Sequence, residues 1–599
     1  MARVKRIGSC WALTTLVLFL APAASATIRY TISLDHPEQH IFHIRMEIPN
    51  ARNGTDVAIP AWNALYQIRD FAYRISHVRA GEKPDPSHAL AIRKLDKQTW
   101  QIDTAPATDS TARNADIIVE YATEWDEQGP FNSQLDSHHA FINYAEVLMY
   151  VPDRRGEDTE VAFENVPPEW QITAELPSSN HPASFTASSY DALVDAPTEA
   201  GKFEQFAFDS LGAHFRVVAD GTNWNKSHLE TFLRRITEYE LRLMNGAPFQ
   251  RYTFFFHIDP SADINGGGME HSYSTAIASS STEGAAAIAA HEFFHAWNVK
   301  RIRPQALEPV DFTKEQYTRA LWFAEGVTST YAAFTLERSG LWSKDQFYAD
   351  LGRQIETLES RPARKWQSVE ESSVDTWLEK YEGYNRPERS ISYYNKGQIL
   401  GVLLDLSIRD ATDNHRCLDD VLRRMNVKYA QQGRFYNDSD DIRAAVQEVA
   451  GVNYEDFFRR YVAGTDDLPY ESFLSAAGLE LKAAAAKTAG VGFVPAMSGK
   501  VLKVSALQSG GAAEQAGLQN GDIILAVNDS RDDKKFAALL RGALPGDTVT
   551  LRIGRGGNEM EISFPAATRE DNRYFIAEVA HPTEKQLRIR DGILHGTTN

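Results

Sequence analysis

The sequence is short of cysteine, of positive charge and of long apolar runs. Two of its 599 residues are cysteines, Cys10 and Cys417, so neither a disulfide scaffold nor cysteine catalysis is expected. Lys and Arg number 62 against 81 Asp and Glu, and the formal net charge of −19 argues against nucleic acid as a partner. Beyond the first 26 residues no run is long and apolar enough to form a transmembrane segment. These shortages leave a soluble, acidic, globular protein.

The amino-terminal segment, residues 1–26, has the pattern of a secretory signal peptide. Three cationic residues precede an apolar run over residues 11–21, and Ala-Ser-Ala follows at residues 24–26. A membrane anchor is the alternative, but the run is shorter than a bilayer span. We predict cleavage before Thr27 and export to the periplasm or the medium. Cys417 is then the only cysteine of the mature chain, and we interpret it as a packing residue.

The apolar pattern changes several times along the chain and predicts a multidomain α+β protein. Short alternating runs indicate a β-sandwich-like domain over residues 27–221, and helical spacing dominates residues 222–480. The alanine-rich stretch 481–488 reads as a linker or an exposed helix. Short strands return in a β domain over residues 489–582, and residues 583–599 are left as a tail.

A metal-binding pattern, His-Glu-x-x-His, stands in the expected helix that follows an alanine-rich segment. Residues four apart share a helix face, so His291 and His295 can present two imidazoles to one ion. Glu292 can then act as the general base toward a water molecule. The alternative is an ordinary amphipathic helix in which the two histidines have no ligand. The pattern predicts one Zn²⁺ per chain.

A catalytic zinc commonly takes three protein ligands, and two carboxylates compete for the third place. Glu325 lies in the apolar stretch Leu-Trp-Phe-Ala-Glu-Gly-Val over residues 321–327, where a buried charge needs a partner. Glu315 is surrounded in sequence by Lys314, Gln316 and Arg319, and such polar neighbours indicate a helix face exposed to solvent. Glu325 is therefore the better candidate.

Two longer stretches carry a resemblance to a known family. His-Glu-Phe-Phe-His-Ala-Trp-Asn-Val-Lys-Arg-Ile-Arg-Pro at residues 291–304 and Trp-Phe-Ala-Glu-Gly at residues 322–326 resemble the glycyl aminopeptidase family of zinc metallopeptidases. That family is related to the aminopeptidase N and thermolysin-like group, and its members commonly carry a carboxy-terminal PDZ domain. The resemblance implies a thermolysin-like, mainly helical catalytic domain, and it supports Glu325 as the third ligand.

The same resemblance suggests roles for residues around the metal. Gly267, Gly268, Met269 and Glu270 are similar to the Gly-x-Met-Glu strand that lies beside the metal, where Glu270 would hold the free α-amino group of a substrate. The alternative is a glycine-rich turn that ends a strand.

Residues 393–397, Tyr-Tyr-Asn-Lys-Gly, resemble the stretch whose tyrosine donates to the oxyanion. Tyr394 matches that position, and Tyr393 is the second choice. Residues 60–72 also resemble the family, although Asn63 and Ala64 stand where its members usually have Pro-Gly.

The carboxy-terminal unit is similar to a bacterial PDZ domain. Its segment Gly490, Val491, Gly492, Phe493 resembles the loop whose backbone N–H groups receive a peptide carboxylate, and the Gly-Ala-Ala-Glu-Gln-Ala-Gly-Leu stretch follows at residues 511–518. This unit can bind a peptide or protein C-terminus, or it can pack on the catalytic body.

Taken with the resemblance, the sequence favours a zinc aminopeptidase that acts on peptides and releases small N-terminal residues such as glycine. Two alternatives stay open: an endopeptidase with the same zinc chemistry, and a non-catalytic peptide-binding PDZ protein. Glu270 separates the first two, because an amine anchor confines cleavage to the first peptide bond.

Overall fold

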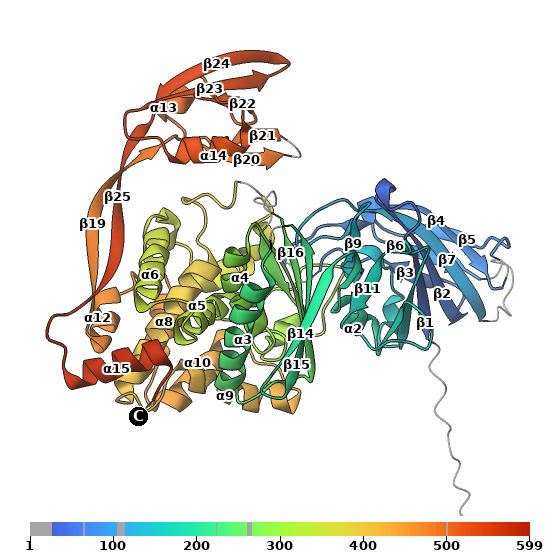
Figure 1. The fold of residues 1–599 in the computed structure, drawn as a ribbon, viewed down its shortest axis with the longest axis horizontal. Coiled ribbons are helices and arrows are strands. Elements are labelled where there is room, and N and C mark those ends of the chain that lie inside the picture. The colour runs from blue at the N-terminus through green and yellow to red at the C-terminus, as the bar shows by residue number, and fades with distance from the viewer. Residues whose placement is uncertain are drawn as a thin grey trace, which may run out of the picture.

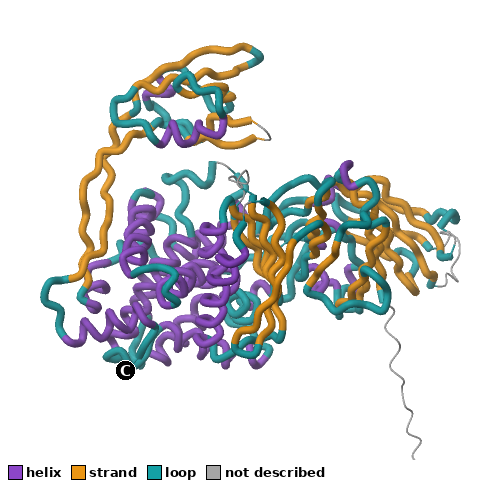
Figure 2. The backbone as a smooth tube through the Cα atoms, viewed as in Figure 1, coloured by secondary structure: helices purple, strands orange, loops and turns teal. Residues whose placement is uncertain are grey.

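The computed structural model describes residues 27–63, 66–84, 86–104, 114–222, 224–259, 266–381, 383–498 and 501–598. The predicted signal segment and Ala64 lie outside these ranges. A β-rich domain, a helical domain with one sheet, and a small β domain follow one another (Figure 1, Figure 2). The expected multidomain α+β class is confirmed. Among the described residues, no helix has both the length and the apolar character needed to cross a bilayer.

The amino-terminal domain is built from three sheets around its own apolar core. Alternate residues of its strands are buried, as in β2, because a strand packed on one face buries every second side chain. Short helices α1 (Tyr144–Val147) and α2 (Tyr190–Val194) cover part of this core. In sheet order the strands are β12 (Ser184–Ala187), β10 (Thr159–Glu164), β1 (Ile28–Ser33), β2 (Ile41–Ala51), β7 (Ala115–Glu124), β4 (Ile75–Glu82); β11 (Gln171–Ala174), β13 (Thr198–Gly201), β9 (His139–Ile142), β8 (Gln134–Leu135); and β3 (Thr55–Ala58), β6 (Thr99–Asp103), β5 (Ala91–Lys94).

The second domain packs helices against a five-stranded sheet. Strands β15, β16 and β18 run parallel, and β17 pairs antiparallel with β18 at one edge. One face of β16 packs into the helical core, where Phe254 and Phe256 are fully buried. The sheet order is β14 (Glu204–Ser210), β15 (Ala213–Gly221), β16 (Arg251–Ile258), β18 (Ser274–Ser279), β17 (Gly267–Glu270).

The helices of this domain form the largest apolar core of the described chain. Helix α8 carries buried residues along most of its length, as a central helix must. Cys417 is buried and free at the start of α9, as expected of a packing residue. The helices are α3 (Lys226–Leu243), α4 (Thr282–Phe294), α5 (Thr328–Arg338), α6 (Lys344–Glu359), α7 (Val369–Val374), α8 (Tyr393–Ala411), α9 (Leu418–Lys428), α10 (Asp438–Ala450), α11 (Glu455–Phe457) and α12 (Tyr470–Leu474).

The boundary predicted at residue 221 falls too late. Strands β14 and β15, which it assigned to the amino-terminal domain, pair with β16 in the sheet of the helical domain. Their alternation of apolar and polar residues is the same as that of the preceding strands. Sheet membership depends on pairing across the chain, which local periodicity does not report.

The stretch 481–488 links the helical domain to the carboxy-terminal unit, as one of the two alternatives predicted, but it is a strand and not a helix. It belongs to β19 (Leu479–Gly490), which pairs antiparallel with β25 (Ala567–Glu578) over the full length of both strands. Alanine favours helices in isolation, but pairing with a partner strand overrides that preference. The resulting ribbon joins the carboxy-terminal domain to the helical domain (Figure 1).

The carboxy-terminal domain is a five-stranded sheet with its own core. Its last strand ends at Pro565, so the predicted limit at residue 582 wrongly includes β25, which lies in the ribbon. Strands β23 and β24 form a hairpin across residues 556–557. The elements are β20 (Val494–Ser498), β21 (Val501–Ser505), α13 (Ala512–Gln515), β22 (Ile523–Val527), α14 (Asp533–Arg541), β23 (Thr548–Arg555) and β24 (Asn558–Pro565).

The predicted tail, residues 583–599, contains helix α15 (Glu584–His595). Thr583 and Gln586 form a capping box at its start. Ile589 and Ile593 are buried in the core of the helical domain, and the Arg338 Nε atom donates to the Ile593 carbonyl at 2.9 Å. The chain therefore returns from the PDZ-like sheet to the helical domain. The few apolar residues of α15 are buried because the helix packs against the helical domain.

Candidate metal centre

The two histidines of the His-Glu-x-x-His pattern lie at the end of α4 and face one another. The helix starts at Ser281, whose hydroxyl accepts from the Gly284 N–H, and alanines fill its first turns. The imidazole rings of His291 and His295 are nearly perpendicular, with centroids 4.6 Å apart. Their Nε2 atoms are 3.0 Å apart. The predicted shared helix face is thus present.

Glu325 joins these two nitrogens from a π-helical turn, Trp322–Val327, that precedes α5. Its Oε2 atom is 3.4 Å from the Nε2 atom of His291 and 3.2 Å from that of His295. The side chain is almost completely buried. Glu315, the rival on sequence spacing, lies on the preceding loop and does not line the pocket around these atoms.

Close packing of two glycines fixes the turn that carries Glu325. A Cβ atom on Gly326 would stand 2.5 Å from the Gly397 Cα atom, and one on Gly397 would stand 2.3 Å from the Trp322 carbonyl oxygen. Neither position has room for a side chain, because the backbones of the turn and of α8 touch. The glycine of the Glu-Gly motif, Gly326, therefore packs directly against the glycine of the Lys-Gly motif, Gly397.

The outer nitrogens of both histidines are also engaged. The His295 Nδ1 atom lies 2.6 Å from the Asn298 carbonyl oxygen, and the His291 Nδ1 atom lies 3.3 Å from the Ser329 hydroxyl. The Asn298 side chain donates to the Phe323 carbonyl at 2.8 Å. Such partners leave Nε2 of each ring as the free ligand atom and hold the ring in place. Asn298 links the helix of the histidines to the turn of the glutamate.

The donor set fits a divalent metal ion. Zinc bound tetrahedrally at about 2.0–2.1 Å separates its ligand atoms by roughly 3.4 Å, close to the distances among these three atoms. Burial raises the pKa of the Glu292 carboxyl well above its usual range, and Glu270 and Glu325 add to the rise. One buried oxygen of Glu292 has no hydrogen-bond partner among the residues that the structure describes. A cation among these carboxylates would offset their repulsion.

Glu270 enters the same pocket from the edge strand β17. One ligand-type atom each of Glu270, Glu292 and His295 lies within 4.8 Å of the others. The predicted segment Gly267–Glu270 is a strand rather than a turn. Met269 points into the protein and is buried, whereas Gly268 and Glu270 line the pocket. The strand thus places one carboxylate beside the metal ligands.

Gly268 touches the predicted general base. A Cβ atom at this position would stand 2.2 Å from Cγ and 2.5 Å from Cδ of Glu292. We expect Gly268→Ala to displace the Glu292 carboxylate and lower kcat/KM about 100-fold, the effect of a misplacement of roughly 1 Å. Metal content should stay unchanged. Peptide hydrolysis and elemental analysis measure the two quantities.

Gly266→Ala is the matched control, because among the described residues beyond its chain neighbours its Cβ would come no closer than 3.5 Å, at the Ala278 carbonyl. It should retain activity. A Gly268→Ala enzyme that works within twofold of wild type would contradict the close approach to Glu292.

The two candidate tyrosines at the start of α8 are clearly distinguished. The Tyr394 ring lies 6.1 Å from the His291 ring, between centroids, and the residue is 39% exposed. Tyr393 is buried, and its hydroxyl lies 3.1 Å from the Thr376 hydroxyl. Both tyrosines line the small pocket at the metal centre, and Tyr394 has the more accessible side chain.

The amino-terminal domain also lines the pocket, which sequence reasoning did not assign. Tyr66, Gln67 and Phe131 face the residues of the metal centre across a space of about 120 Å³. Residues 60–72, which include Tyr66 and Gln67, resemble the family, but the resemblance did not suggest a role for them at the site. Tyr66 and Glu270 also border a larger cavity of about 870 Å³ between the two domains. A peptide extending beyond the metal centre has room there.

The loop predicted to receive a carboxylate lies between the ribbon and β20. Gly492 adopts φ +75°, and its carbonyl accepts from the Gln508 N–H at 2.7 Å. Phe493 is buried and packs against Phe564. The ribbon holds this domain away from the helices (Figure 1).

Comparison with known proteins agrees with these features. Models of the M61 glycyl aminopeptidase, the M61 N-terminal domain and the PDZ domain match residues 285–400, 29–202 and 489–565. An aminopeptidase N family protein from Idiomarina loihiensis is 25% identical, with a TM-score of 0.79, covering 95% of this chain and 100% of that one.

An M1 zinc metallopeptidase from Deinococcus radiodurans is 13% identical, with a TM-score of 0.43, covering 74% of this chain and 94% of that one. No curated protein matches. The family models confirm the resemblance seen in the sequence, and the chain is a peptidase, a hydrolase of peptide bonds.

Proposed function

We propose that this peptidase, with its M61-like catalytic region and PDZ domain, is a zinc-dependent aminopeptidase that releases small N-terminal residues such as glycine. The observation that carries the proposal is the convergence of His291, His295 and Glu325 with a base, Glu292, and a separate carboxylate, Glu270, in one pocket. A metallopeptidase needs the first four residues. A fifth, negatively charged group suits the cationic amine of a free peptide end.

His291, His295 and Glu325 would hold the zinc ion, one per chain. When bound there, zinc supplies Lewis-acid chemistry that polarises a carbonyl oxygen and makes a water molecule more acidic. Glu292 takes a proton from the attacking water and passes it to the leaving amine. The Tyr394 hydroxyl donates to the oxygen that becomes negative as the carbonyl is attacked.

Glu270 explains why cleavage would stop at the first bond. Its carboxylate stands at a short, fixed distance from the ligand atoms, so a bound α-amino group sets which carbonyl reaches Glu292. The rings of Tyr66, Phe131 and Tyr394 line the same small pocket. A pocket crowded by aromatic rings favours a small N-terminal side chain, and the glycyl preference in the family's description agrees with that.

Two further proposals accompany this function. The pattern at residues 1–26 supports export to the periplasm or medium, where peptides would be the substrates. The segment Gly490–Phe493 precedes β20 in a domain that stands clear of the helices, which supports binding of a peptide or protein C-terminus there.

Metal removal tests the function directly. We expect a chelator to abolish hydrolysis of glycyl peptides, and Zn²⁺ added back in equimolar amount to restore it, because all proposed steps need the polarised carbonyl. Peptide hydrolysis and elemental analysis of the same samples give the result. Full activity in a protein shown to be free of metal would refute a metallopeptidase.

A further inference from the structure

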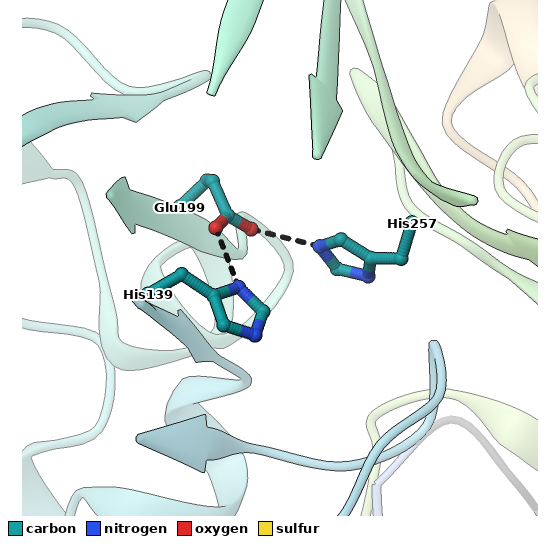
Figure 3. Close-up of side chains that lie close together, drawn as sticks. All are labelled: His139, Glu199 and His257. Carbon is teal, nitrogen blue, oxygen red and sulfur yellow. Dashed lines mark hydrogen bonds and ion pairs between the residues drawn. The ribbon is translucent and has the colours of Figure 1, made fainter. Parts of the chain in front are cut away.

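A second cluster of two histidines and one glutamate lies at the joint between the amino-terminal and helical domains (Figure 3). His139 is on β9 and Glu199 on β13, both in the four-stranded sheet of the amino-terminal domain. His257 is on β16, in the sheet of the helical domain. The cluster is thus assembled from two domains and is separate from the metal centre on α4.

The alternation of β16 explains why His257 faces the amino-terminal domain. Phe254, Phe256 and Ile258 point into the helical core, so the residues between them point the opposite way. On that opposite face Phe255 packs on Phe141 of β9, and the Phe141 and His257 rings are 4.7 Å apart between centroids. The cluster sits beside this small apolar contact.

One carboxylate connects both imidazoles. The His139 Nδ1 atom is 2.9 Å from Oε1 of Glu199, and the His257 Nε2 atom is 2.8 Å from Oε2. Figure 3 shows each ring with one nitrogen directed at the carboxylate. One ligand-type atom from each of the three residues lies within 4.8 Å of the others. A modest closure, of about 1 Å, would let all three contact one ion.

Two carboxylates lie beside the imidazoles of the cluster. The Glu199 side chain is fully buried, and it contacts the two histidines, which are positive only when protonated. Asp220 adds a second carboxylate, with Oδ2 3.8 Å from the His139 Nδ1 atom. The site therefore attracts positive charge strongly.

The approach to the cluster is open on one side. The side chain of His257 is 17% exposed and that of Asp220 is 29% exposed, whereas Glu199 is closed off. A hydrated ion could reach the imidazoles from that side and exchange its water for the buried carboxylate. Asp220 stands where it can supply a fourth oxygen.

We propose that His139, Glu199 and His257 bind a second divalent transition-metal ion, of the Zn²⁺ class, that ties the amino-terminal domain to the helical domain. Two imidazoles and one carboxylate are the same donor set as that of His291, His295 and Glu325, and they suit zinc and its neighbours rather than Mg²⁺ or Ca²⁺. Ligands from two domains would make this ion a structural one, and it has no part in hydrolysis.

Zinc titration of the metal-free protein, with elemental analysis after dialysis, tests the proposal. We expect two equivalents in the wild type and one in His257→Gln. His214→Gln, on the neighbouring strand β15, is the matched control and should retain two, because the half-exposed His214 ring pairs with the exposed Asp209 and lies outside the cluster. His295→Gln, which disables the metal centre on α4, should retain one equivalent.

The outcomes separate this inference from the proposed function. Wild-type protein with one equivalent that disappears in His295→Gln would overturn the second site and leave the peptidase intact. One equivalent that disappears in His257→Gln instead would support the second site and refute the catalytic zinc. If His257→Gln fails to fold, His295→Gln still decides: a folded protein without zinc overturns the proposal.

Discussion

Replacing Glu292 by Gln is expected to abolish turnover while zinc is retained. Glutamine keeps the size of the side chain but cannot accept a proton from water, and general-base catalysis typically contributes about 10²–10⁴-fold to the rate. The three residues that would hold the ion are His291, His295 and Glu325, so Glu292 is not needed as a ligand. The kcat for a glycyl peptide should therefore fall by that factor, with an unchanged metal content.

Glu283→Gln is the control for this substitution. It removes the same charge from the first turn of α4, where the side chain is 73% exposed and pairs with His228. Its activity should equal that of the wild type. A Glu292→Gln enzyme with near-normal kcat would show that another group takes the proton, and the assignment of the base would be wrong.

The second large effect is expected for Tyr394→Phe. Loss of a single hydrogen-bond donor to a developing oxyanion typically lowers kcat about 10²–10³-fold. The Phe ring would preserve the packing against His291, so folding and zinc content should not change. Steady-state kinetics on a glycyl peptide should show the loss mainly in kcat, because the oxygen is negative only as the reaction proceeds.

Tyr393→Phe provides the comparison on the adjacent residue. The Tyr393 hydroxyl contacts Thr376 in the interior, so its removal should lower stability by about 1 kcal/mol and change kcat little. If Tyr393→Phe lost kcat and Tyr394→Phe did not, the roles of the two tyrosines would be reversed.

The metal centre was predictable because its signals are local. Helical spacing alone places His291 and His295 on one face, and the apolar surroundings of Glu325 single it out from Glu315. The structure adds the reason for the glycines that follow, since Gly326 and Gly397 allow the turn and α8 to touch. The partners of the outer nitrogens, Asn298 and Ser329, stand in or near the motifs but have no sequence pattern that reveals their role.

Features that depend on pairing between distant segments could not be predicted. Strands β14 and β15 have the alternation of any half-buried strand, and only their pairing with β16 assigns them to the helical domain. Alanine-rich β19 becomes a strand through β25, about ninety residues later. Helix α15 has few apolar residues, and its core partners come from elsewhere in the chain.

The part of the pocket that the amino-terminal domain lines could not be predicted either, because it depends on contacts between distant segments. Tyr66 and Phe131 reach the metal centre only because two domains meet there. The cluster of His139, Glu199 and His257 also arises at that meeting, from three strands in two sheets. Spacing along the chain gives no sign of either.

The role of Glu270 is tested most directly by comparing a glycyl peptide with its N-acetylated form, with the wild type and Glu270→Gln assayed side by side. If Glu270 holds the free α-amino group, the wild type should prefer the free peptide about 10- to 100-fold in kcat/KM, the worth of a charged hydrogen bond. Glu270→Gln should lose most of that preference. Cleavage of the acetylated peptide by the wild type as fast as the free one would contradict an aminopeptidase.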